Sequence, residues 1–503
     1  MMATGGQAKA AAIFKSTESV DVGDPPRSAI ELEPTTVLVL TTLAASALYF
    51  FRLGAASLGA SEAYSAWAAA MPSPMSIIHI AVPLDPGKQV FYYILLHYFT
   101  GVFGVSETTL RMLSPIFAVA TLPILFILAR TMFDDSIAAS AVVLWAFNPV
   151  ILLLARRARM YPMLAAIALT HFMLLWLVRR KPNWPRTIVC GFFGALAIYT
   201  HLAALFLIGA EGAMLLRDYL HRRRNPMPWI ALAIALTLFL PYFPIFSTQS
   251  SQMVHGHWLD WIGTGYHFSF AAKALVALVA TAIAIAIVFG PRSEDDPDEP
   301  LRWCLAWGLL PLIAFLSGTA IIRPMFHIRY LIPCVAMIAL IFARVLEGFG
   351  SRTRNLAIVA ITLVLLILAP IKEITHEPWR DIAAMISAHS PPNQPVFFES
   401  GFLFFDGSEG EANPGFPTGY YRNAFDYYFH GGNPRVAIPG WDSAAAKSIV
   451  TDRAAQAGGG WLVTWKSAPN VRAELPNADA FRITQLVDYH LIALYRIEPA
   501  ASH

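Results

Sequence analysis

Long apolar runs recur along most of this chain, and they constrain its fold more than any other feature of the sequence. A helix that crosses a lipid bilayer needs about 20 consecutive apolar residues, although tilted or protein-buried helices can be shorter. About eleven runs approach this length, which predicts a polytopic α-helical membrane protein. Hydrophobic residues make up 56% of the chain and charged residues only 14%, well below the roughly 25% of soluble domains. The candidate spans lie near 35–52, 111–131, 136–155, 160–178, 187–200, 201–217, 228–246, 271–290, 303–320, 329–346 and 356–371.

The two ends of the chain differ in composition from this apolar middle. Residues 1–34 are polar and lack the apolar core of a signal peptide, which predicts a disordered cytoplasmic tail. Residues 35–371 form the predicted transmembrane domain. From 372 to 503, Gly and Pro interrupt short strand-like runs, so a small soluble α/β domain is expected. Its predicted elements are a helix at 378–388 and strands at 396–398, 460–464 and 491–496.

Basic residues in short loops orient a multi-pass protein, because they favour the cytoplasmic side. The basic runs at 179–181, 222–224 and 352–354 follow alternate predicted spans, so all three can face the cytoplasm together. This count places the N-terminus inside, and it places the C-terminal domain and a large loop at 53–110 outside. Within that loop, Phe91–Phe103 is too short to cross easily and is predicted to be an interfacial or re-entrant helix. Because the basic residues form short bursts between apolar runs, they do not indicate nucleic-acid binding.

One basic burst conflicts with this orientation rule. Arg156, Arg157 and Arg159 lie about one helix length before the cluster at 179–181, so the two clusters must lie on opposite faces of the membrane. An anionic ligand at the outer leaflet would explain cations placed there. Arginines that extend toward lipid headgroups would explain them equally well.

The first outer loop also carries the acidic residues best suited to chemistry. Glu62 and Asp85 lie in it together with Lys88, and a partly desolvated carboxylate there could act as a general base or hold a divalent cation. An ordinary loop carboxylate is the alternative for Glu62. His255 and His257 are a weak metal signal without a third ligand, and no zinc-finger, EF-hand or phosphate-loop motif is present. The three cysteines all lie in apolar runs, so no disulfide framework is predicted.

Several short motifs, in order, resemble the GT-C membrane glycosyltransferases. The resemblance is to bacterial relatives of the protein O-mannosyltransferases and of the aminoarabinose transferase that modifies lipid A. No single motif is specific, but their common order extends over about 330 residues, which makes coincidence an unsatisfactory explanation. The motifs are SEAYSAW (61–67), DPGKQVFYYILLHYF (85–99), SETTLRMLS (106–114), NPVILLLARRARMYPM (148–163), YTH (199–201), RYLIP (329–333) and PWRDIAAMI (378–386).

This resemblance implies an inverting transferase that moves a sugar from a polyprenyl-phosphate donor to a lipid, glycan or protein acceptor. It also implies a location in the bacterial inner membrane, with the C-terminal domain in the periplasm. Mapped onto this chain, Glu62 is the expected base and Asp85 the second acid, with no certain cofactor beyond a possible divalent cation. The expected substrate-binding and phosphate-binding residues are Lys88, Arg159, Tyr161, His201, Arg329 and Tyr330.

The chain departs from the family pattern at three places near the expected chemistry. Ser61 stands where the family has Asp, Arg157 where it has Glu, and Gln89-Val90 where it has Pro-Pro. Two other functions therefore stay open. One is a catalytically silent relative that binds a lipid-linked sugar or scaffolds a partner. The other is a transporter of a lipid-linked substrate, although the repeated halves and broken midplane helices typical of transporters are not visible in the sequence.

Overall fold

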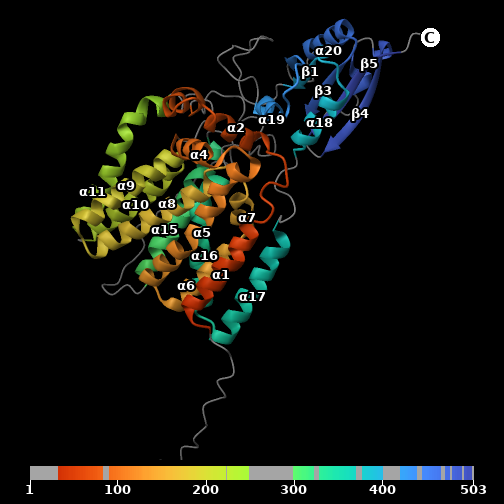
Figure 1. Cartoon of the computed structure of the whole chain (residues 1–503). Coiled ribbons are helices and arrows are strands. Elements are labelled where there is room, and N and C mark those ends of the chain that lie inside the picture. The colour runs from red at the N-terminus through yellow and green to blue at the C-terminus, as the bar shows by residue number, and fades with distance from the viewer. Residues whose placement is uncertain are drawn as a thin grey trace, which may run out of the picture.

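The computed structural model is a helical bundle that continues into a smaller part built on a β-sheet (Figure 1). It describes residues 32–82, 90–221, 224–247, 298–321, 328–369, 377–399, 420–438, 444–465, 471–475, 478–489 and 492–500. The longer bundle elements are α1 (Pro34–Tyr49), α2 (Ala60–Ala69), α4 (Val90–Phe103), α5 (Glu107–Met132), α6 (Asp135–Ala146), α7 (Pro149–Ala155), α8 (Tyr161–Arg180), α9 (Trp184–Thr200), α10 (Ala204–Leu220), α11 (Met227–Phe239), α15 (Glu299–Ile321), α16 (Ile332–Leu346) and α17 (Ser351–Leu368). Shorter helical turns are α3 (Pro74–Ser76), η1 (Ile77–Ala81), η3 (Leu240–Tyr242) and η4 (Ile328–Leu331).

Among the described residues, six helices are long and apolar enough to cross a membrane. A seventh crossing is added if α6 and α7, which are bent by 58° relative to each other, form one span. Most other predicted spans coincide with shorter helices such as α1, α9 and α10, and the prediction at 271–290 lies outside the described residues. A helical, multi-pass membrane protein is therefore supported, while the count of about eleven spans stays a prediction.

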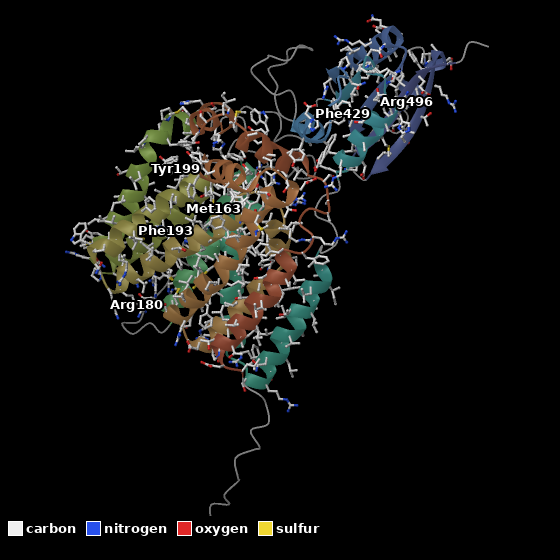
Figure 2. The ribbon with its side chains drawn as sticks, viewed as in Figure 1. Met163, Arg180, Phe193, Tyr199, Phe429 and Arg496 are labelled. Atoms are coloured by element: carbon white, nitrogen blue, oxygen red, sulfur yellow. The ribbon has the colours of Figure 1, made fainter. Side chains whose placement is uncertain are left out.

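Two of the basic clusters of the sequence lie at the ends of α8, with 156–159 just before its first residue and 179–181 at its other end. Figure 2 shows Met163 toward the end of the bundle near the sheet and Arg180 at the opposite end. At the far end, Arg179 is buried and bonds to Asp218 of α10 at 2.5 Å and to Glu299 of α15 at 2.5 Å. A buried cation is costly unless it is paired, so these bonds hold three helices together at that end.

A second buried polar group joins helices in the middle of the bundle. The His171 side chain of α8 contacts Glu211 of α10 at 2.9 Å, and Trp307 of α15 donates to the same carboxylate at 2.8 Å. Every polar atom named here has a partner, as buried groups in an apolar environment require. Together with the apolar core, the contacts define how α8, α10 and α15 pack.

The C-terminal part contains a five-stranded mixed sheet with the strand order β2-β1-β3-β5-β4. β1 is parallel to β2 and β3, whereas β5 is antiparallel to both β3 and β4. The sheet and its helices are α18 (Trp379–His389), β1 (Val396–Glu399), α19 (Tyr420–Tyr428), β2 (Arg435–Ile438), α20 (Ala444–Ala457), β3 (Gly460–Trp465), α21 (Val471–Glu474), η5 (Ala478–Ala480), β4 (Phe481–Tyr489) and β5 (Ile492–Pro499). The predicted helix and three predicted strands coincide with α18, β1, β3 and β5, and the sequence missed β2 and β4.

The sheet-bearing part contacts the bundle at the end where α2 lies. Figure 1 shows α18 and α19 between the sheet and α2. Arg380 of α18 bonds to Glu107 at the start of α5 at 2.5 Å, and Tyr428 of α19 donates to the same carboxylate at 3.2 Å. The Tyr428 hydroxyl also accepts a bond from the backbone N–H of Leu58 at 2.6 Å. These contacts place the C-terminal segment directly beside the first loop.

Candidate active site

The first loop is organised by a buried ion pair between Glu62 of α2 and Arg111 of α5. Arg111 donates from Nε to one carboxylate oxygen at 2.7 Å and from Nη2 to the other at 2.9 Å. Its remaining donors reach the carbonyl oxygens of Leu53, Ala56 and Ser57. Both charged side chains are almost completely buried, so the pair and its hydrogen bonds fix the path of the chain into α2.

The Glu62 carboxylate is also bonded by two backbone N–H groups. Ala158 donates to Oε1 at 2.9 Å, and Gly59 donates to Oε2 at 3.1 Å, which caps the N-terminus of α2. Burial by itself raises the pKa of Glu62, but Arg111 and these hydrogen bonds outweigh it and hold the pKa below its usual range. A carboxylate has about four acceptor positions, and four donors occupy them here. This geometry favours an anchoring role for Glu62, in contrast with the base expected from the sequence.

Arg159 lies in the turn between α7 and α8 and points toward the same helix. Its Nη1 donates to the carbonyl oxygen of Ser61 at 2.9 Å and approaches the hydroxyls of Ser65 at 3.3 Å and Tyr93 at 3.4 Å. Its own carbonyl accepts a bond from Ser114 of α5 at 2.9 Å, and the side chain is buried. The guanidinium beside the first turn of α2 therefore belongs to a segment almost a hundred residues away in the sequence.

An aromatic cluster surrounds a second arginine beside α8. Arg329 lies 5.8 Å from the ring centre of Tyr161 and 5.3 Å from that of Tyr330, and its Nη2 approaches the Tyr330 hydroxyl at 3.4 Å. The His201 ring is 4.9 Å from Tyr330 and 6.0 Å from Tyr161. Aromatic faces stabilise a guanidinium and fix its orientation. The structure thus brings together Tyr161, His201, Arg329 and Tyr330, four residues that the sequence singled out separately.

The tautomer of His201 follows from its backbone contact. The N–H of Ala203 donates to His201 Nδ1 at 3.0 Å, so in the neutral ring the proton lies on Nε2. His201 therefore presents a donor from the other side of its ring. A donor next to an arginine suits an anionic or hydroxyl-rich ligand.

The two arginines of the site act on each other. Arg159 and Arg329 lie close enough for their like charges to interact, although their positions in the chain differ by 170 residues. Cations that converge near a membrane repel each other, and an anion bound between them would relieve that repulsion. Tyrosine hydroxyls from positions 93, 161 and 330 lie in the same region. The arrangement can bind a phosphate group and stabilise its negative charge.

A carboxylate that the sequence did not single out lies at the start of α2. Glu377 precedes α18, and its Oε2 accepts bonds from the N–H of Ala60 at 2.6 Å and from Trp379 Nε1 at 2.8 Å. The hydroxyl of Ser57 donates to its backbone carbonyl at 2.5 Å. Burial raises the pKa of Glu377, and the nearby Glu62 charge adds to this effect. The only sequence signal was its position directly before the PWRDIAAMI motif.

Two predicted residues cannot be placed. Asp85 and Lys88 lie outside the described residues, as do His255 and His257. Among the side chains that the structure does describe, no three His, Cys, Asp or Glu residues converge on a point that would hold a metal ion. Of the eight residues assigned from the sequence, Glu62, Arg159, Tyr161, His201, Arg329 and Tyr330 are described.

This architecture is the GT-C fold of membrane glycosyltransferases, and it confirms the resemblance seen in the motifs. Residues 88–245 match the family model described as dolichyl-phosphate-mannose-protein mannosyltransferase. That segment contains Arg159, Tyr161 and His201. No curated protein matches the chain in sequence.

The particular structures that the chain resembles include ArnT from Cupriavidus metallidurans. In its apo state, ArnT is 13% identical, covers 92% of this chain and 98% of its own, and superposes with a TM-score of 0.57. The same protein bound to undecaprenyl phosphate is 14% identical over 91% of this chain and 97% of its own, with a TM-score of 0.55. The oligosaccharyltransferase of Archaeoglobus fulgidus, in complex with Zn and sulfate, is 13% identical over 88% of this chain and 71% of its own, with a TM-score of 0.51.

Proposed function

We propose that this chain is a membrane glycosyltransferase that moves a sugar from a polyprenyl-phosphate donor to an acceptor. The observation that carries the proposal is that Arg159, which bonds to the first turn of α2, interacts electrostatically with Arg329. Arg329 in turn lies in an aromatic cluster with Tyr161, Tyr330 and His201. Arginine forks bind phosphate in bidentate fashion and stabilise it as a leaving group. The structural likeness to ArnT bound to undecaprenyl phosphate supports a lipid-linked donor.

In this proposal the residues have distinct roles. Arg159 and Arg329 bind the donor phosphate, and Tyr161 and Tyr330 hold Arg329 in position and donate hydrogen bonds. His201 lines the same site, while Lys88 and Asp85, which lie outside the described residues, are proposed contributors. Glu62 anchors α2 through Arg111. The phosphate gains negative charge as the bond to the sugar breaks, so the arginines lower the barrier at that step.

We also propose the topology expected from the basic loops. The N-terminal residues 1–34 face the cytoplasm, residues 35–371 cross the bacterial inner membrane about eleven times, and residues 372–503 form a periplasmic α/β domain. The basic clusters at 156–159 and 179–181 lie at opposite ends of α8, which agrees with their expected placement on opposite faces of the membrane. The acceptor would then enter on the side of α18 and α19.

Binding of the donor phosphate tests the first step of this function. Arg329→Gln removes a charged donor, and its affinity for undecaprenyl phosphate should fall by about 10- to 100-fold, the equivalent of 1.5–3 kcal/mol. Arg130→Gln is the matched control, since Arg130 forms an ion pair with Asp135 in which both side chains are about half exposed. Unchanged binding of undecaprenyl phosphate by Arg329→Gln would contradict the assignment of the site.

Transfer tests the reaction itself. Purified protein is incubated with a panel of radiolabelled polyprenyl-phosphate hexoses and pentoses and with membranes that supply the acceptor. Incorporation of label that depends on Arg159 and Arg329 is the expected result. The Ser61 and Arg157 departures favour a second function, that of a silent binder. That function is established instead if undecaprenyl phosphate binds tightly and no sugar is transferred or released.

A further inference from the structure

At the start of α2, neither of the two described residues at the SEAYSAW motif that correspond to the family's acidic pair offers an obvious base to the proposed transferase. Ser61 has no carboxylate, although it occupies the position where the resembled family has Asp. Glu62 accepts four hydrogen bonds, from Arg111 Nε and Nη2 and from the N–H groups of Ala158 and Gly59. A general base needs an acceptor position that can face the proton it removes. Among the described residues, another carboxylate beside α2 is therefore a candidate for this role if the acceptor is a hydroxyl.

Glu377 has the placement that this role requires. Its Oε2 is held by the N–H of Ala60 at 2.6 Å and by Trp379 Nε1 at 2.8 Å, so the carboxyl group has a defined orientation at the first turn of α2. The hydrogen bonds from described residues all reach Oε2, and none of them uses Oε1. Unlike Glu62, Glu377 therefore has one carboxylate oxygen, Oε1, that accepts no hydrogen bond from the described residues. Its side chain is only partly buried.

The same turn of α2 connects Glu377 to the phosphate-binding arginines. Ala60 bonds to Glu377, and the next residue, Ser61, accepts a bond from Arg159 at 2.9 Å. The Arg159 charge in turn acts on Arg329. Among the described residues, Glu62 raises the pKa of Glu377 and Arg157 lowers it through their charges. The Glu377 carboxylate and the Arg159 guanidinium thus bond to adjacent residues in the first turn of α2.

We propose that Glu377, which lies just before α18, is the general base of the sugar transfer and that the acceptor is a hydroxyl group. This inference rests on the proposed function. In the reaction, Oε1 takes the proton of the acceptor hydroxyl while the acceptor oxygen bonds to the anomeric carbon. The bond between that carbon and the phosphate oxygen breaks, and the electron pair leaves with polyprenyl phosphate. Glu377 then releases its proton to water.

The acceptor class follows from the chemistry of a base. A neutral hydroxyl is a weak nucleophile until its proton is removed, so it benefits from a carboxylate. A phosphate acceptor is already anionic, and a carboxylate beside it would repel it. Burial raises the pKa of Glu377 above its usual range, which makes a carboxylate a stronger base when it is ionised.

A matched pair of variants separates this role from a structural one. Glu377→Gln retains a carbonyl oxygen that can accept the bonds from Ala60 and Trp379, whereas Glu377→Ala removes them. If Glu377 only caps α2, Glu377→Gln should transfer sugar at the wild-type rate. If Glu377 is the base, Glu377→Gln should lose about 100-fold or more of kcat while its affinity for undecaprenyl phosphate is unchanged.

A pH profile and a rescue variant give readouts that a structural role would not change. Because the base must be ionised, wild-type kcat should rise with pH through the raised pKa of Glu377, and this dependence should be flat in Glu377→Gln. Ser61→Asp added to Glu377→Gln places a carboxylate on the same turn. This double variant should have a kcat at least tenfold above that of Glu377→Gln, and its kcat should rise with pH at a lower pH than in the wild type. The assay measures release of sugar to water and transfer to membrane acceptors.

The outcomes distinguish this inference from the proposed function. Wild-type transfer with unchanged kcat in Glu377→Gln overturns the base assignment and leaves the transferase intact. Glu377→Gln is compared with the wild type on lipid acceptors that carry either a hydroxyl or a phosphomonoester. If its kcat falls equally with both kinds of acceptor, the hydroxyl assignment is overturned. Absence of transfer and of sugar release by the wild type, despite binding of undecaprenyl phosphate, overturns the proposed function and this inference with it.

Discussion

Substitution of Glu62 should destabilise the protein rather than remove a catalytic base. Glu62→Leu deletes a carboxylate that lies with Arg111 in an almost completely buried pair. The two Arg111 donors and the N–H groups of Ala158 and Gly59 would lose their acceptor together. The variant therefore tests whether the charge organises the first loop or performs chemistry there.

The size of the effect follows from the partners left behind. Removal of one member of a buried ion pair costs about 3–5 kcal/mol, because the other charge stays buried without compensation. The two backbone N–H groups add to this cost, since an unsatisfied buried donor costs about 1–3 kcal/mol. Natural domains have a total stability of about 5–15 kcal/mol, so Glu62→Leu should lose a large share of it.

The assay is the free energy of unfolding in mixed micelles, measured for Glu62→Leu, Arg111→Met and the double variant. The double variant should lose less than the sum of the two single losses, by about 0.5–3 kcal/mol, because neither charge then stays buried alone. Arg130→Met removes a half-exposed pair and should cost no more than about 1 kcal/mol. Wild-type stability of Glu62→Leu, together with loss of transfer, would refute this reasoning and restore Glu62 as the base.

Two further predictions concern the docking of the C-terminal segment and its side of the membrane. Arg380→Gln breaks the ion pair with Glu107, so the segment should detach more often and be cleaved faster by a protease added to the purified protein; an unchanged cleavage rate would show that the pair is dispensable. The three native cysteines are buried, so single cysteines introduced at exposed positions report topology cleanly. Asp452→Cys should react with an impermeant maleimide in intact cells and Asn183→Cys only after lysis, and the reverse pattern would invert the proposed orientation.

Apolar run length and turn composition predicted much of the secondary structure. The run at 111–131 became α5 (Glu107–Met132), and the strand-like run at 396–398 became β1 (Val396–Glu399). Both patterns are local, because the spacing of apolar residues in one continuous segment indicates whether that segment forms a buried helix or strand. β2 (Arg435–Ile438) was missed because it has only four residues, and β4 (Phe481–Tyr489) because polar residues interrupt it. Such strands are defined by their neighbours in the sheet rather than by their own sequence.

The candidate site was less accessible to prediction because its contacts join distant parts of the chain. Glu62 pairs with a residue 49 positions away, and Glu377 bonds to Ala60 across 317 positions. A carboxylate that closes a buried ion pair and one that can face a substrate have the same local pattern, a single acidic residue beside a polar turn. The hydrogen bonds that each carboxylate accepts distinguish them. Glu62 accepts four, on both of its oxygens, whereas Glu377 accepts two from described residues, both on Oε2. The chemistry of the first loop can therefore be assigned only once its long-range partners are known.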